Sequence, residues 1–130
     1  MPAPAQATFS VAALIAAQTS FRNLIDSGAG AGYLNIRSST DVLLAQVPFL
    51  DPCGTVSATT GQLTMLLNGR DDAADATGTA AYGELCDSGG VVHLTLPAQA
   101  GFAATPGKLI ISTASIVMGD PVEVISATVG

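Results

Sequence analysis

The residues best placed to do chemistry are the acidic side chains of segment 71–90, where Asp71, Asp72 and Asp75 stand close together. Neighbouring carboxylates can hold Ca²⁺, but an EF-hand loop needs acidic or amide side chains at alternate positions, a glycine and a glutamate at the twelfth position. The three aspartates do not have this spacing. We therefore predict a solvated loop whose aspartates form Asx-turns. A looser calcium site, completed by distant oxygen ligands, is the alternative.

The other titratable side chains offer no stronger candidate for catalysis. Paired carboxylates do acid–base work in glycosidases, but no aromatic sugar platform accompanies them in this sequence. The single histidine, His93, needs partners to act as a base or a ligand, and no serine lies in a GxSxG elbow. We predict solvated carboxylates, an exposed or interfacial His93, no catalytic residues, no cofactor and no metal. The acidic residues considered are Asp71, Asp72, Asp75, Glu84, Asp87, Asp120 and Glu123.

Two glycine-containing segments resemble phosphate-binding loops but do not have the residues or the order of elements that such loops need. In segment 101–108, GFAATPGK, Pro106 stands where a P-loop needs its second glycine, and Leu109 follows the lysine in place of Ser or Thr. The run GAGAG at 28–32 follows a predicted helix and precedes a predicted strand, which is the reverse of the dinucleotide-binding order. We interpret 28–32 as a flexible connection.

The two cysteines, Cys53 and Cys86, are far apart and form no CxxC pair. This spacing is not that of a zinc site. We expect two buried free thiols, with a disulfide between them as the alternative. The N-terminal residues have no basic region typical of a secretory signal, so we expect a reducing compartment.

Composition and charge exclude several functional classes. The chain has 130 residues, which suits one domain, and its net charge is −6 from 4 basic and 10 acidic residues. Nucleic-acid binding needs clustered Lys and Arg, and a membrane-spanning helix needs roughly 20 apolar residues in a row; we predict neither nucleic-acid nor membrane partners. Only 11% of the residues are charged while 48% are hydrophobic. This balance indicates that a partner covers part of the surface.

One helix is predicted, at about 10–27, with Ser10 as its N-cap and Gly28 as its C-terminal glycine. Apolar side chains recur on one face at helical spacing. This face packs either on a sheet of the same chain or on a neighbouring subunit. Residues 1–9 are predicted to form an extended arm, either flexible or docked on a neighbour.

After residue 33 the pattern changes to short alternating segments separated by turns. We predict seven or eight strands, with DPCG at 51–54 breaking one of them and GG at 89–90 making a tight turn. The spacing is typical of an antiparallel β-sandwich, jelly-roll or immunoglobulin-like. The predicted fold class is therefore mainly β, with a single sandwich domain over 10–130 and one N-terminal helix.

Three stretches carry a resemblance to a known family: ADATGTAAY at 74–82, DSGGVV at 87–92 and TASIVMGDPVEV at 113–124. Over residues 10–129 the sequence resembles small tailed-phage proteins that are encoded among the virion structural genes. The family usually has an aromatic and a basic residue where this chain has Gly83 and Glu84. A basic contact at that place is therefore in doubt.

The resemblance implies a non-enzymatic virion structural protein, most plausibly a decoration or cement protein on the capsid surface. It would be assembled in the host cytoplasm and would bind the major capsid protein and copies of itself, as a dimer or trimer. A neck, tail or baseplate component and a surface adhesin are the alternatives, and an adhesin would need exposed aromatic residues such as Tyr33, Tyr82 and Phe102. The predicted interface residues are Pro4, Phe9, Leu14, Phe21, Leu24 and Ile25.

Overall fold

The structure is a computed structural model that describes residues 10–105 and 107–129. It begins with helix α1, Val11–Ile25, whose N-cap Ser10 accepts a hydrogen bond from the backbone N–H of Ala13 (3.1 Å). The predicted helix and its N-cap are therefore confirmed. The helix ends earlier than predicted, because its C-cap is Asp26 and not Gly28. The predicted arm at residues 1–9, including Pro4 and Phe9, lies outside the described residues.

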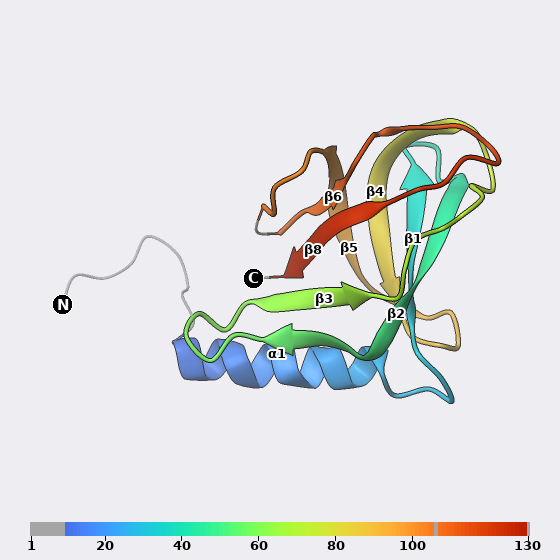
Figure 1. Cartoon of the computed structure of the whole chain (residues 1–130). Helices are drawn as coiled ribbons and strands as arrows, with labels where there is room; N and C mark the ends of the chain where they lie inside the picture. The colour runs from blue at the N-terminus through green and yellow to red at the C-terminus, as the bar shows by residue number, and fades with distance from the viewer. Residues whose placement is uncertain (1–9, 106, 130) are drawn as a thin grey trace.

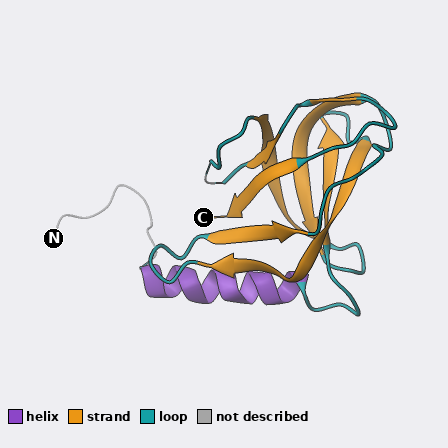
Figure 2. Cartoon of the chain, viewed as in Figure 1, coloured by secondary structure: helices purple, strands orange, loops and turns teal. Residues whose placement is uncertain are grey.

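Eight strands follow the helix within the described part of the chain (Figure 1). The predicted number was seven or eight. Their bounds are β1 Tyr33–Ser38, β2 Leu43–Val56, β3 Leu63–Leu67, β4 Gly78–Cys86, β5 Val92–Ala100, β6 Leu109–Ile111, β7 Ser115–Ile116 and β8 Val124–Val129. Among the described residues after α1, the chain forms strands, turns and loops (Figure 2).

The predicted β-sandwich is wrong, because the sheet closes into a seven-stranded barrel. The strands follow the order β1-β2-β3-β8-β6-β5-β4, and β4 pairs again with β1. In that closing pair Leu34 lies opposite Leu85 and Ile36 opposite Gly83. A sandwich would leave these two strands as sheet edges, whereas the closed ring uses their backbone groups in the ladder. The short β7 pairs with β4 outside the ring.

Two further expectations about the strands are corrected. DPCG at 51–54 does not end a strand: β2 continues through it to Val56, with a register shift between Phe49 and Gly54. The first part of β2 pairs with β1 and the last part with β3, so the irregularity lets one strand turn a corner of the barrel. The sheet is also not wholly antiparallel, because β5 and β6 run parallel.

The core lies inside the barrel and between the barrel and α1. Its largest fully buried side chains include Phe49, Leu34, Ile36 and Leu109. Helix α1 packs against β2 and β3 of its own chain and runs beneath them (Figure 1), which decides between the two predicted places for its apolar face. Gln18, in mid-helix, donates a side-chain hydrogen bond to the carbonyl of Val129 (3.3 Å) and so ties α1 to the end of β8.

Gly83 marks a narrow place in the barrel interior. A Cβ atom at this position would lie 2.7 Å from a methyl carbon of Leu109 and 3.1 Å from one of Leu34. Side chains that enclose a small barrel must alternate in size to fill its interior. Glycine at position 83 therefore makes room for the leucines that face it.

In the described part of the chain, no helix has the length and apolar character needed to cross a bilayer.

Candidate interaction surface

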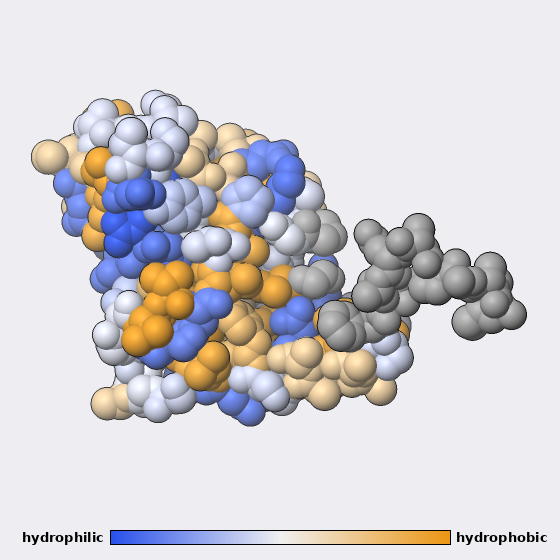
Figure 3. Space-filling view, turned by 180° about the vertical axis from the view of Figure 1, so that it is seen from behind, coloured by the Kyte–Doolittle hydropathy of each residue, from blue (hydrophilic) through white to orange (hydrophobic). Residues whose placement is uncertain are grey.

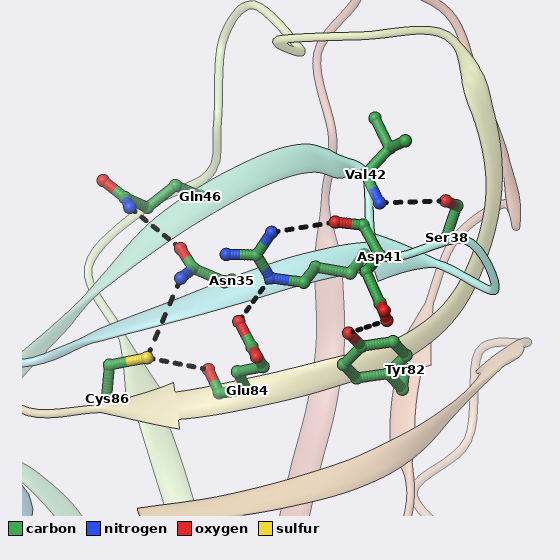
Figure 4. Close-up of polar contacts among 9 residues, drawn as sticks. Asn35, Ser38, Asp41, Val42, Gln46, Tyr82, Glu84 and Cys86 are labelled. Atoms are coloured by element: carbon green, nitrogen blue, oxygen red, sulfur yellow. Dashed lines mark hydrogen bonds and ion pairs between the residues drawn. The ribbon is translucent and has the colours of Figure 1, made fainter. Parts of the chain in front are cut away.

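A row of polar side chains crosses the outer face of β1, β2 and β4 (Figure 4). Leu34 and Ile36 of β1 face the core, so the residues between and beside them, Asn35 and Arg37, face outward. Asn35 accepts a hydrogen bond from the Gln46 side-chain amide (2.8 Å) and donates one to the Cys86 sulfur (3.8 Å). These contacts leave Asn35 only 7% exposed, although it lies outside the barrel.

Arg37 forms the charged centre of this row. Its Nε pairs with Glu84 of β4, and its Nη1 donates to the carbonyl of Asp41 (3.0 Å). The hydrogen bond to Glu84 raises the pKa of Arg37 above its already high value. Glu84 thus neutralises a basic residue supplied by the neighbouring strand.

Tyr82 completes the network beside the β1–β2 turn. Its hydroxyl donates to Oδ1 of Asp41 (2.6 Å), a residue held at a positive φ of 65° in the turn. The hydrogen bond to Asp41 raises the pKa of Tyr82. Aspartate is one of the few residues besides glycine that adopt the αL backbone of such a turn. The groups in this row bind one another, so we assign to the row a role in holding the strands in register.

Asp87 and His93 form a second polar pair, across the turn between β4 and β5. The Nε2 of His93 lies 2.9 Å from Oδ2 of Asp87, and both side chains are about 15% exposed. The other carboxylate oxygen accepts the backbone N–H groups of Gly89 (2.9 Å) and Val91 (3.1 Å). The hydrogen bond to His93 is the main cause that lowers the pKa of Asp87. His93 is therefore mostly buried and paired with Asp87, so the predicted exposed histidine is wrong, and the interfacial alternative stays a prediction.

The cysteines are both buried free thiols, as predicted, and form no disulfide. Burial raises the pKa of Cys53 to about 12 and that of Cys86 to about 11. For Cys53 the nearby Asp26 carboxylate adds to the effect. A nucleophilic cysteine needs its thiolate form at neutral pH, and both thiols here are held in the protonated form.

The three aspartates of segment 71–75 have different contacts, and only Asp71 accepts hydrogen bonds from backbone N–H groups. Asp71 Oδ1 accepts the backbone N–H of Ala73 (3.0 Å), which is the predicted Asx-turn. Its Oδ2 accepts the N–H of Gln46 in β2 (2.9 Å), a contact that the sequence did not indicate. Asp72 pairs with Arg70 (3.1 Å), and Asp75 is exposed. Within residues 10–105 and 107–129, no three His, Cys, Asp or Glu side chains are grouped to hold a metal ion.

The predicted interface residues of α1 have different environments. Ile25 is fully buried in the core of its own chain, and Phe21 packs partly against that core. Leu14 is half-buried beside Gly61, where an added Cβ would lie 2.9 Å from it. Leu24 keeps 45% of its surface exposed and is the described member best placed to meet a partner.

Large apolar side chains are exposed at several other places, and hydrophobic residues gather with polar ones on the face drawn in Figure 3. The exposed ones are Val11, Leu24, Val42, Leu50, Val91, Val92, Phe102, Val117 and Met118. Of the three aromatics that an adhesin would present, Phe102 is 80% exposed, whereas Tyr33 and Tyr82 are half-buried. No pocket opens in the described part of the chain.

No protein-family model matches the chain, and neither the curated proteins nor the solved structures contain a match to it.

Proposed function

We propose that the chain is a non-enzymatic structural protein of a tailed-phage particle, which binds the major capsid protein on the head surface and stabilises it. The observation that carries this proposal is the exposure of apolar side chains around a small closed barrel, with Met118 at 63% and Phe102 at 80%. Exposed apolar side chains mark contact surfaces when they lie together, and Met118 has a second exposed apolar residue, Val117, beside it in the chain. The sequence resemblance implies that this contact is made on a phage particle.

The state of the polar groups also supports a structural role. Several titratable groups that were considered for catalysis are engaged with one another, as in the Arg37–Glu84 and Asp87–His93 pairs, and the two thiols are protonated. A cement subunit needs a rigid scaffold and a contact of roughly 800 Å² per partner. A barrel with its strand edges joined is rigid and does not aggregate through those edges. Binding at many equivalent sites on a head would add avidity.

Electron microscopy of particles that carry a C-terminal tag tests the proposal. We expect gold label over the head, and we expect heads without the protein to rupture at a lower temperature than complete heads. Label confined to the neck or tail would replace the cement function with the alternative structural role. Absence of the protein from purified particles would overturn the proposal altogether.

The docked-arm hypothesis has its own test. Deletion of residues 1–9 should weaken binding to purified heads if the arm pairs with a neighbouring chain. Unchanged binding by the truncated protein, with an unchanged melting temperature, would exclude it.

A further inference from the structure

The end of the barrel away from α1 carries three exposed apolar side chains. Val117 and Met118, in the loop between β7 and β8, have 49% and 63% of their surface exposed, and Val42, just before β2, has 45%. The backbone N–H of Met118 donates to the hydroxyl of Thr77 (2.9 Å). The loop is therefore fixed on the barrel while the Met118 side chain stays largely in solvent.

Hydrogen bonds join these segments into one surface. The backbone N–H of Ala74 donates to the carbonyl of Asp120, and that of Gly119 donates to the carbonyl of Ala74, both at 2.9 Å. The N–H of Asp75 donates to the carbonyl of Leu44 (2.8 Å), which brings the same loop beside the start of β2. Figure 1 shows the two loops running together across the end of the barrel opposite α1.

Negative charge is concentrated on the same surface. Six of the ten acidic residues of the chain lie in these two loops and the neighbouring β1–β2 turn. One of the four basic residues, Arg70, lies among them, and it is paired with Asp72; Arg37, close to the turn, is paired with Glu84. We call this surface the acidic rim; its residues are Asp41, Val42, Asp71, Asp72, Asp75, Val117, Met118, Asp120 and Glu123.

We propose that the acidic rim is a docking surface for a protein partner whose contact face carries Lys and Arg side chains around an apolar depression. The depression would take Met118 and Val117, and the basic side chains would face the carboxylates. Complementary charge of this kind steers association and excludes partners of like charge. Two copies of this chain would repel each other rim to rim, and so would the phosphates of a nucleic acid. The proposal rests on the proposed function only in taking the partner to be part of the particle.

The first experiment tests the rim apart from the particle, with a peptide of alternating lysine and leucine as the probe. Calorimetric titration of the full chain at low salt should show binding that weakens as salt is added. Asp75→Lys should reduce the affinity at least fivefold and Met118→Ser should do the same. The matched controls lie outside the rim. They are Asp51→Lys, at an exposed aspartate, and Val91→Ser, at a valine that is 55% exposed. Each control should change the affinity for the peptide less than twofold. Equal losses in the controls, or no binding by the wild-type chain, would overturn the proposal.

The second experiment places the rim on the particle. Heads lacking the protein are mixed with each variant, and the bound fraction is measured after sedimentation. Asp75→Lys and Met118→Ser should lower the apparent affinity at least tenfold, and the two controls should bind like the wild type. Selective peptide binding combined with no binding of the wild type to heads would overturn the proposed function while supporting the rim. Equal binding of all variants to heads would overturn the rim as the particle contact.

Discussion

Asp71 binds the backbone of β2 along an edge that no strand covers: its carboxylate oxygen Oδ2 accepts a hydrogen bond from the backbone N–H of Gln46 (2.9 Å). The first part of β2 pairs with β1 on one side only, since β3 pairs from Phe49 onward. The backbone N–H of Asp75 donates to the carbonyl of Leu44 along the same edge. The loop thus takes the place of a neighbouring strand over the part of β2 that β3 does not reach.

Replacement of Asp71 should destabilise the chain more than replacement of its neighbour. In Asp71→Ala the N–H of Gln46 and that of Ala73 both lose their acceptor, a loss worth about 1–3 kcal/mol in the free energy of unfolding. Asp72→Ala breaks an exposed ion pair with Arg70, which contributes about 0–1 kcal/mol. Urea unfolding of both variants measures the difference. Equal stabilities would mean that the Asp71 side chain does not support the β2 edge.

Substitution of Gly83 should overfill the barrel. The side chain of Gly83→Val would collide with Leu109 and Leu34, and overpacking of this kind costs about 1–3 kcal/mol. The matched control is Gly30→Ala, because nothing lies within 4 Å of a Cβ added at Gly30. Thermal unfolding should show a lower melting temperature for Gly83→Val only. An unchanged melting temperature for Gly83→Val would contradict the narrow interior.

The elements that could be predicted from the sequence are those that local pattern determines. Alternation of apolar residues correctly predicted short strands after residue 33, and the spacing of apolar residues together with Ser10 predicted α1. Alternation has the same period in a sandwich and in a barrel, so it could not show that β1 returns to pair with β4. DPCG at 51–54 was overvalued as a breaker, because a bulge lets β2 pass through it.

The polar pairs of the candidate surface depend on which strands are neighbours. The Arg37–Glu84 ion pair and the Tyr82–Asp41 hydrogen bond join strands far apart in sequence, and no local signal connects these residues. Asp87 and His93 were different, since they are six residues apart across a predicted tight turn. The predicted tight turn at 89–90 brings the two residues to the ends of neighbouring strands, but the pair was not predicted from the sequence.

The thiols should react slowly in the folded chain. At pH 8 a thiol with a pKa of about 11 or about 12 is ionised to roughly one part in a thousand or less, and both sulfurs are also shielded from solvent. We expect Cys53 and Cys86 to react with a colorimetric disulfide reagent at least tenfold more slowly in the native chain than in urea. Rapid labelling of either residue in the native chain would contradict its burial.

Asp87 should make stability depend on acid pH. The folded state lowers the pKa of Asp87 from its ordinary 3.8 through the hydrogen bond to His93 and the backbone N–H groups of Val91 and Gly89. A carboxyl whose pKa is lowered by folding stabilises the folded state at pH values above the unfolded pKa, and this stabilisation is lost as the pH falls through the folded value. Asp87→Asn cannot ionise, so it should be less stable than the wild type at pH 6, and the two should converge as the pH falls below about 4. Denaturant unfolding at several pH values measures the convergence. The control is Asp51→Asn, at an exposed aspartate outside the β4–β5 turn. A stability difference between Asp87→Asn and the wild type that stays constant from pH 6 to pH 3 would show that ionisation of Asp87 does not stabilise the β4–β5 turn.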